Sequence, residues 1–195
     1  MPAGRPLEYD PDAALEAAMQ LFWRQGYEAT SLQDLLREMR LSKSSFYQAF
    51  GSKHALFGRC IDHYRDSLAR GMQQQLEAAP RAWDFIAGML QSVAGETQGE
   101  DARRGCLVMN TASEFGQSDA EVAARVRAGT ARFRKVFLQA VKRAQAEGDI
   151  PAERDAGLLA DYLVTNMSGL RSLTKAGASA ASIRRIAGVT LSALR

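Results

Sequence analysis

The side chains best suited to chemical recognition in this sequence lie between residues 30 and 57. No Asp or Glu occurs from Met39 to Ile61. The basic residues of that window are Arg40, Lys43, Lys53 and Arg59. A basic surface that contains no acid is suited to binding phosphates, so the window indicates a nucleic-acid backbone as the partner.

Catalytic chemistry has no comparable support in the sequence. His54 and His63 are accompanied by no constellation of Ser, Cys or carboxylate residues, and no Gly-rich phosphate loop occurs. Cys60 and Cys106 lie far apart and form no C-x-x-C motif, so a zinc site and a disulfide framework are not indicated. The sequence therefore predicts no enzyme, no metal and no cofactor.

Three helix starts must position the basic window. Thr30 with Gln33 has the spacing of a capping box, and Ser42 and Ser52 each precede a further helix. Only residues 39–41 separate the first helix from the second. A turn that short forces a sharp crossing and leaves the second helix projecting, which is the helix-turn-helix arrangement.

The second of these helices has two chemically different faces. Phe46 and Phe50 are one helical turn apart and take the buried face. The opposite face presents Lys43, Ser44, Ser45, Tyr47 and Gln48. Lysine and tyrosine suit phosphate contacts, and Gln48 can read a base edge in the major groove. Lys53, in the first turn of the next helix, offers a phosphate its charge and nearby N–H groups. The alternative is a solvated helix and a surface lysine without a partner.

A larger set of residues stands at fixed spacing in this part of the chain. Its members are Phe22, Gly26, Tyr27, Thr30, Ser31, Leu41, Ser42, Lys43, Phe46, Tyr47, Phe50, Ser52, Lys53, Leu56 and Phe57. The set resembles the DNA-binding domain of TetR-type transcriptional repressors of the TetR/AcrR family. Two positions depart from the family pattern, because Ala49 stands where an aromatic residue is usual and His54 where Glu is usual.

The resemblance implies double-stranded operator DNA as the partner of a homodimer. The residues expected to contact DNA are Arg5, Thr30, Ser31, Ser42, Lys43, Ser44, Ser45, Tyr47, Gln48 and Lys53. Arg5 belongs to the segment of residues 4–6, which resembles arms that reach into a minor groove. A tail without a role is the alternative for this segment.

Helical periodicity continues to the end of the chain. One apolar stripe runs from about Lys53 to Pro80, and further helices are expected at 81–95, 105–115, 119–147, 155–176 and 179–194. No segment alternates with period two, so the predicted fold class is all-α with about nine helices. We expect a helix-turn-helix DNA-binding domain at residues 1–55 and a ligand-binding and dimerisation domain at 56–195. The boundary falls inside the long helix because no linker composition separates the two.

The last two expected helices are apolar over more than one face. These two helices have more apolar surface than the rest of one small domain can cover, which favours a four-helix interface between two copies of the chain. The residues assigned to it are Leu159, Leu163, Leu170, Ile186 and Leu191. The alternative places both helices inside a monomer core. A dimer with two-fold symmetry would present two helix-turn-helix domains to the two half-sites of a palindromic DNA sequence.

The middle helices combine methionines, aromatic residues and a few polar groups. Such a mixture suits a small-molecule pocket and equally suits a core. The resemblance implies an inducer site here, and the expected lining residues are Met72, Trp83, Met89, Cys106, Met109, Asn110, Phe133, Phe137 and Met167.

Cys106 is also a candidate sensor of electrophiles or oxidants. Its segment, residues 104–114, resembles the Gly-Cys-Leu start of the sixth helix in electrophile-sensing members of the family. Preceding arginines and a helix N-terminus favour a thiolate, and Lys175 matches a lysine that partners the cysteine in such sensors. Asn110 replaces a lysine found in those sensors, and an inert buried thiol is the alternative.

Composition sets the remaining limits. The chain has 195 residues, of which 46% are hydrophobic and 24% charged, as expected for a protein with a core. Its net charge of +3 favours an anionic partner only weakly, so charge placement carries the nucleic-acid argument. No apolar run suits a membrane span, and the low cysteine content fits a reducing cytoplasm. We expect an inducible homodimeric repressor; the rival hypotheses are a helical small-molecule-binding protein and an adaptor without a DNA-dependent role.

Overall fold

The computed structural model describes residues 9–98 and 104–195. Within these ranges it contains nine α-helices, one short 3-10 helix and no strand, so the all-α prediction is confirmed. The described helices include none with the length and apolarity needed to cross a membrane. The same residues bring together no group of His, Cys, Asp and Glu side chains that could hold a metal ion.

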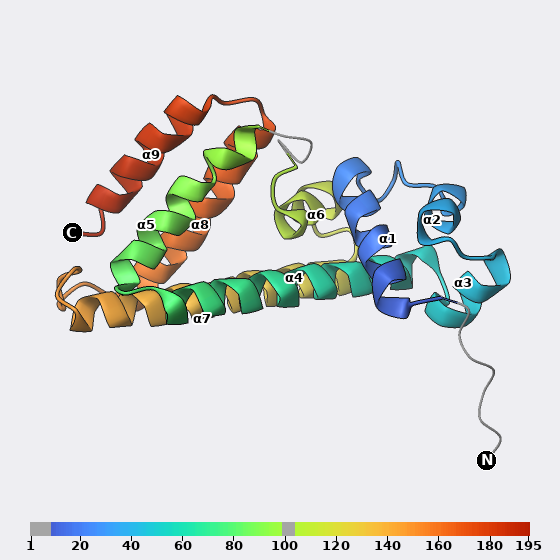
Figure 1. The fold of residues 1–195 in the computed structure, drawn as a ribbon, viewed down its shortest axis with the longest axis horizontal. Coiled ribbons are helices and arrows are strands. Elements are labelled where there is room, and N and C mark those ends of the chain that lie inside the picture. The colour runs from blue at the N-terminus through green and yellow to red at the C-terminus, as the bar shows by residue number, and fades with distance from the viewer. Residues whose placement is uncertain (1–8, 99–103) are drawn as a thin grey trace, which may run out of the picture.

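The N-terminal helices form a small head at one end of the molecule (Figure 1). They are α1 (Pro11–Gln25), α2 (Leu32–Met39), α3 (Lys43–Phe50) and the start of α4 (Lys53–Ala78). The side chain of Asp10 caps α1 by accepting hydrogen bonds from the N–H groups of Asp12 and Ala13, at 2.9 and 3.3 Å. Phe22 and Phe46 lie in the core beneath these helices and are almost fully buried.

The capping box of α2 is built one residue later than expected. Ser31 accepts from the N–H of Asp34 at 3.1 Å, and Asp34 accepts from the N–H of Ser31 at 3.3 Å. Thr30 is fully buried, and its hydroxyl donates to the carbonyl of Gly26 at 2.6 Å. The prediction of a capping box at Thr30 and Gln33 is therefore wrong, because the Thr30 hydroxyl is used within the turn.

Helix α4 runs without interruption across the predicted domain boundary. Its first turns pack against α1, and further along it packs against α7 (Ala120–Ala146). Figure 1 shows α4 and α7 side by side along the long axis of the molecule. A single helix therefore joins the head to the remaining part of the chain, which we call the body.

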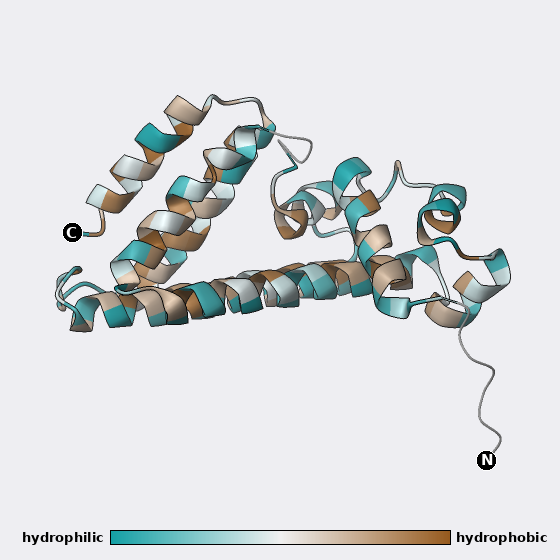
Figure 2. Ribbon diagram, in the orientation of Figure 1, coloured by the Kyte–Doolittle hydropathy of each residue, from teal (hydrophilic) through white to brown (hydrophobic). Residues whose placement is uncertain are grey.

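The body is a layered helical bundle built on α4 and α7. Its other elements are α5 (Ala82–Ser92), the 3-10 helix η1 (Gly95–Thr97), α6 (Leu107–Phe115), α8 (Ala156–Lys175) and α9 (Ala180–Ser192). Helices α5 and α8 both pack on α7, and α9 packs on both of them. Figure 2 shows apolar residues gathered where these helices face one another and polar residues on the outward sides of α4 and α7.

Candidate nucleic-acid interface and ligand cavity

Helix α3 is held so that one face remains available to a partner. Ser42 caps it by accepting from the N–H of Ser45 at 3.1 Å, and its first turn contains no acid. Phe46 and Phe50 are buried beneath it, whereas Tyr47 is 46% exposed. The distribution of faces agrees with the helical spacing of the two phenylalanines.

Most residues expected to contact DNA are accessible. Exposed members of the set are Ser31, Ser42, Lys43, Ser44, Tyr47 and Gln48, and half-buried members are Ser45 and Lys53. Thr30 is a correction, because its fully buried hydroxyl is bonded to the Gly26 carbonyl and cannot reach a phosphate. Arg5 lies outside the described residues.

The four cations of the acid-free window are in different situations. The Nζ of Lys53 lies 4.2 Å from the centre of the Tyr27 ring. Arg59 donates to the carbonyl of Ala49 at 3.1 Å, so it fastens the end of α3 to α4. Lys43 and Arg40 are exposed and form no ion pair with the described residues. They are the two cations most available to a phosphate.

At the candidate DNA-binding surface, Arg40 is a cation to which the sequence analysis gave no role. It was part of the basic window but was not assigned a contact with DNA. It ends α2 in the left-handed conformation, with φ of 54°, and so lies in the turn between α2 and α3. An exposed arginine beside a protruding helix is well placed for a backbone phosphate.

Helix α6 is fastened to the head at both of its ends. Before its start, the carbonyl of Gly105 accepts a hydrogen bond from Trp23 Nε1 of α1 at 3.2 Å. At its end, the carboxylate of Glu114 accepts from the N–H groups of Tyr27 and Glu28 at 3.0 and 2.8 Å. Gly26, at φ of 84°, leaves room for this carboxylate, which would lie only 3.2 Å from a side chain there.

A second contact joins the head to the body beside this helix. His54 Nε2 lies 2.7 Å from Asp119 Oδ2, and Asp119 also caps α7 by accepting from the N–H of Val122 at 3.0 Å. The Val122 hydrogen bond, and after it the His54 hydrogen bond, lower the pKa of Asp119 below its ordinary value. His54 is thus bonded to the cap of α7 across the boundary between head and body.

The body contains a partly open apolar cavity of about 30 Å³ between α4, α5, α6, α7 and α8. Seven of the expected lining residues surround it: Met72, Met89, Cys106, Met109, Phe133, Phe137 and Met167. Sequence reasoning missed Leu68, Thr130, Val164, Ser168 and Arg171, which complete the wall. Thr130, Ser168 and Arg171 bring polar groups to an otherwise apolar space.

Two expected lining residues lie elsewhere and are corrected. The ring of Trp83 lies against the guanidinium of Arg195, with 4.3 Å between the Arg195 Cζ and the ring centre. Asn110 donates to the carbonyl of Arg104 at 2.8 Å and lines a different cleft, between head and body. Lys175 lines that same cleft, so Lys175 and Cys106 face separate spaces.

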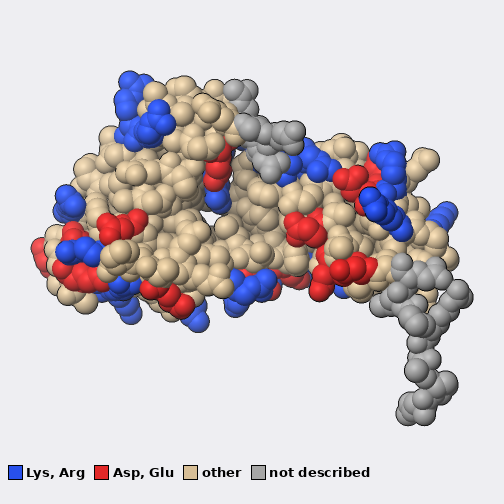
Figure 3. All heavy atoms as spheres, in the orientation of Figure 1, with Lys and Arg blue, Asp and Glu red and all other residues tan. Residues whose placement is uncertain are grey.

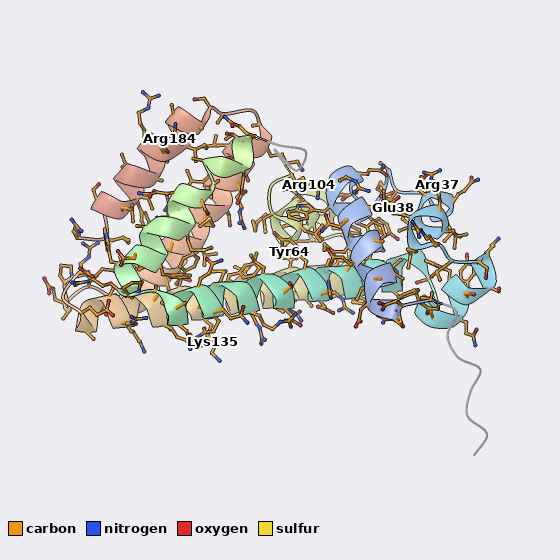
Figure 4. All side chains as sticks on the ribbon, viewed as in Figure 1. Arg37, Glu38, Tyr64, Arg104, Lys135 and Arg184 are labelled. Atoms are coloured by element: carbon orange, nitrogen blue, oxygen red, sulfur yellow. The ribbon has the colours of Figure 1, made fainter. Side chains whose placement is uncertain are left out.

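A larger cleft of about 470 Å³ adjoins the cavity on the side of α1. Figure 3 shows the molecule hollowed above α4, between α6 and the layer of α5 and α8. Leu68, Met72, Met89 and Arg171 line both the cavity and the cleft. These four residues therefore form the wall between the two spaces. Tyr64 lines the cleft where α4 passes beneath α6 (Figure 4).

The two cysteines are both buried, but their surroundings differ. Cys60 lies in the head core against α1, and burial raises the pKa of its thiol. Cys106 is 6% exposed at the N-terminus of α6, next to the side chain of Tyr64. Burial first, and then the neighbouring Cys106, raises the pKa of Tyr64 well above its ordinary value. Tyr64 therefore stays protonated and able to donate.

The apolar surface of the last two helices differs from the predicted one. Leu159, Leu163 and Leu170 are at most 4% exposed within the single chain, so these three are corrected to core residues. Ile186 is 36% exposed and Leu191 half-buried. The large exposed apolar side chains of α8 and α9 are Leu158, Leu173, Ile186 and Val189.

Comparison with known proteins gives consistent matches over most of the chain. The family model described as "Bacterial regulatory proteins, tetR family" matches residues 14–60, and "Tetracyclin repressor-like, C-terminal domain" matches residues 78–189. The chain is 32% identical to the HTH-type transcriptional repressor ComR of Escherichia coli (strain K12), over 96% of this chain and 90% of that protein.

Solved structures show the same similarity. A cysteine mutant of the TetR family transcriptional regulator CifR, complexed with 26-bp double-strand operator DNA, has a TM-score of 0.85. It is 30% identical and covers 98% of this chain and 100% of its own. The reduced form of E. coli NemR, 17% identical over 94% of each chain, has the same fold with a TM-score of 0.82.

Proposed function

We propose that this chain, which belongs to the tetR family of bacterial regulatory proteins, holds a palindromic operator as a homodimer. It is a DNA-binding transcriptional repressor. The observation that carries the proposal is the exposed, acid-free face of α3, whose opposite face is anchored by Phe46 and Phe50. Operator DNA is the partner, which places the repressor in the cytoplasm of a bacterial cell.

Helix α3 would lie in the major groove. Lys43 and Arg40 then reach phosphates on either side of the helix start, and Tyr47 adds a hydroxyl contact. Gln48 can donate to and accept from an adenine edge, so we assign it base readout. The half-buried Lys53, at the start of α4 with its Nζ over the Tyr27 ring, offers its charge to the nearby phosphates.

The dimer would form through α8 and α9. Leu158 and Val189 are 67% and 68% exposed, and Leu173 and Ile186 extend the same apolar surface. Water-exposed leucine and valine side chains on two adjacent helices are suited to a four-helix contact with a second copy. We place the DNA-binding domain at residues 1–55 and the ligand-binding and dimerisation domain at 56–195.

An inducer in the body would release the operator through α6. This helix has Cys106 and Met109 at the cavity and Glu114 on the head, so a shift at one end is carried to the other. The inducer must prefer the head spacing that does not match the operator. A preference of about 1–3 kcal/mol, typical of allosteric coupling, would lower operator affinity roughly 5- to 150-fold.

Modification of Cys106 is a second route to the same shift. Its sulfur lines the cavity close to the Arg171 charge and at the start of α6, so an added group would press on the cavity wall. Treating the dimer with N-ethylmaleimide and mapping the thiols by mass spectrometry tests this route, with Cys60 as the internal control. Operator release that persists in Cys106→Ser, or a Cys106 no more reactive than Cys60, contradicts it.

A gel-shift experiment on the DNA flanking the chain's own gene tests the proposed function. We expect a retarded band at low salt that weakens as salt rises, because lysine and arginine contacts release counterions. The absence of any retarded band at low salt would favour a small-molecule-binding or adaptor protein instead.

A further inference from the structure

Arg171 is a basic side chain placed where the apolar cavity meets the cleft. It projects from α8 and is 14% exposed. Its acidic partner is Glu96 of η1, whose side chain is 33% exposed. Of the described residues that line the cavity and the cleft, Arg171 is the only lysine or arginine. Burying a guanidinium costs free energy unless an anion pairs with it, so Arg171 favours an anionic ligand at this site.

The existing pair leaves part of the guanidinium unused. Both Nε and Nη2 of Arg171 donate to the same atom, Glu96 Oε1, at 3.2 and 3.0 Å. The described residues provide no hydrogen-bond acceptor for Nη1. A guanidinium binds a carboxylate best when two N–H groups donate to two different oxygens. Arg171 therefore retains capacity for a second, better-aligned anion.

We propose that this site binds an apolar organic acid, with its carboxylate on Arg171 and its hydrocarbon part between Leu68, Met72 and Met89. The inference rests on the proposed function, because it names the chemical class of the inducer held by the body. The ligand carboxylate replaces Glu96 as the partner of the guanidinium. Tyr64, which lines the same cleft and stays protonated, is a second donor.

Size and charge favour this class over others. The cleft of about 470 Å³ is within the range of small-molecule sites, roughly 300–1,000 Å³, whereas the cavity alone is too small. Methionine side chains adapt readily, so the wall formed by Met72 and Met89 can open to join the two spaces. One guanidinium balances one carboxylate. A dianionic phosphate would lack a second cation, and the cleft also contains Glu16.

The test measures direct binding to the intact dimer by isothermal titration calorimetry. The probes are butanoate, octanoate, benzoate and cyclohexanecarboxylate, each compared with its primary amide. We expect at least one acid to bind more tightly than its amide, and Arg171→Gln to weaken that acid roughly 10- to 100-fold because charge-assisted hydrogen bonds are lost. Arg171→Lys keeps the charge but cannot donate two parallel hydrogen bonds to a carboxylate, so an intermediate loss of acid affinity is expected.

Two further variants separate ligand binding from a purely structural ion pair. Glu96→Gln removes the competing carboxylate and is expected to tighten acid binding several-fold. Arg134→Gln is the matched control, because Arg134 on α7 pairs with Asp161 on α8 at 2.6 Å and lines neither space. It should leave acid affinity unchanged. Where Arg171→Gln does not fold, Arg171→Lys and Glu96→Gln provide the test.

The inference is overturned if no acid binds more tightly than its amide, or if the Arg171 and Glu96 variants leave acid affinity unchanged. Operator binding is measured separately on the same proteins. If the acid binds but the operator is not released, the binding site is supported but the acid is not the inducer. Failure to bind any operator would contradict the proposed function while leaving the acid site intact.

Discussion

Lys43 is the side chain whose position most directly links this sequence to DNA. It is exposed in the first turn of α3 and forms no ion pair with the described residues. Its neighbour Ser42 holds the helix start, because the Ser42 hydroxyl accepts a hydrogen bond from the N–H of Ser45 at 3.1 Å. A capped helix start and an unpaired lysine together give a phosphate contact with a fixed position.

Replacement of Lys43 by alanine is expected to weaken operator binding without changing stability. The lost phosphate contact should lower the slope of log affinity against log salt by about one. Unfolding by urea should stay within about 0.5 kcal/mol of wild type, because the side chain is exposed. The control is Lys135→Ala, since Lys135 points outward from α7, far from α3 (Figure 4). Equal effects of the two substitutions would place DNA on another face.

Asp119 gives the head–body contact a defined pH dependence. Its folded-state pKa is lowered from 3.8, so its contribution to stability is fully present above about pH 4 and is lost as the pH falls through the folded-state value. Asp119→Asn keeps a capping side chain but loses the charge. Urea unfolding between about pH 3 and pH 7 should show the difference between wild type and variant shrinking at low pH. A constant difference would exclude the charge as its cause.

For single residues, the sequence predicted which side chains are buried in α3 but not which are buried in α8. The spacing of Phe46 and Phe50 predicted the buried face of α3, because two large apolar residues one turn apart leave little choice. Leu159 and Leu163 could not be assigned in the same way, since α8 is apolar on both sides. Only the packing of α7 against α8 decides which leucines are core.

Helix α6 is the element that connects the ligand cavity to the head. Its start is bonded to Trp23 of α1, and Glu114 near its end is bonded to the turn that follows α1. Phe115 packs on Tyr27 and Phe57, with ring centres 5.2 and 5.5 Å apart. A helix fixed to the head at both ends must move with it. The coupling of ligand to DNA is therefore expected to depend on these end contacts.

Glu114→Gln is expected to uncouple the two domains while leaving each folded. The variant leaves one neutral acceptor oxygen where two carboxylate oxygens accept from two N–H groups, and it should cost about 1 kcal/mol at this exposed position. Operator affinity without ligand should change little, whereas ligand-driven release should weaken. Glu147→Gln is the matched control, because Glu147 accepts from the N–H of Ala82 at 2.8 Å wholly within the body. Equal loss of coupling in both would contradict the role of α6.

Helix boundaries were largely predictable, and the reason is local. Ser42 and Ser52 cap the starts of α3 and α4, as predicted from their hydroxyl groups. The end of α6 falls at Gly116, at φ of 56°. The error at Thr30 arose because two hydroxyl residues stand side by side, and the choice between them depends on which one the fold buries.

The molecule as a whole is a head and a body joined by one helix, with an apolar surface on α8 and α9. The surface could be predicted from the excess of apolar residues. Of its members, Ile186 was predicted. Leu158 and Val189 were not, because only the packing of α9 on α5 and α8 distinguishes them from buried neighbours. Seven residues of the cavity lining were predicted, whereas Arg171 was not, because it carries no sequence signal of its own.

Val189→Glu is expected to give folded monomers, because the exposed charge stays in water in the single chain but is buried in the dimer. Leu163→Glu places a charge in the core of the single chain and should unfold it, at a cost of several kcal/mol. Ala131→Glu, at an exposed position of α7, is the control. Analytical ultracentrifugation with circular dichroism distinguishes the three. A Val189→Glu dimer as stable as wild type would exclude this surface.

The central claim is that two copies of α3 read a palindromic operator, and footprinting of the DNA flanking the gene tests it most directly. We expect wild type to protect two symmetric half-sites whose centres lie about one helical turn, or a multiple of it, apart. Lys43→Ala should lose this protection at concentrations where Lys135→Ala retains it. Protection of a single asymmetric site, or the same footprint from Lys43→Ala as from wild type, would contradict the account.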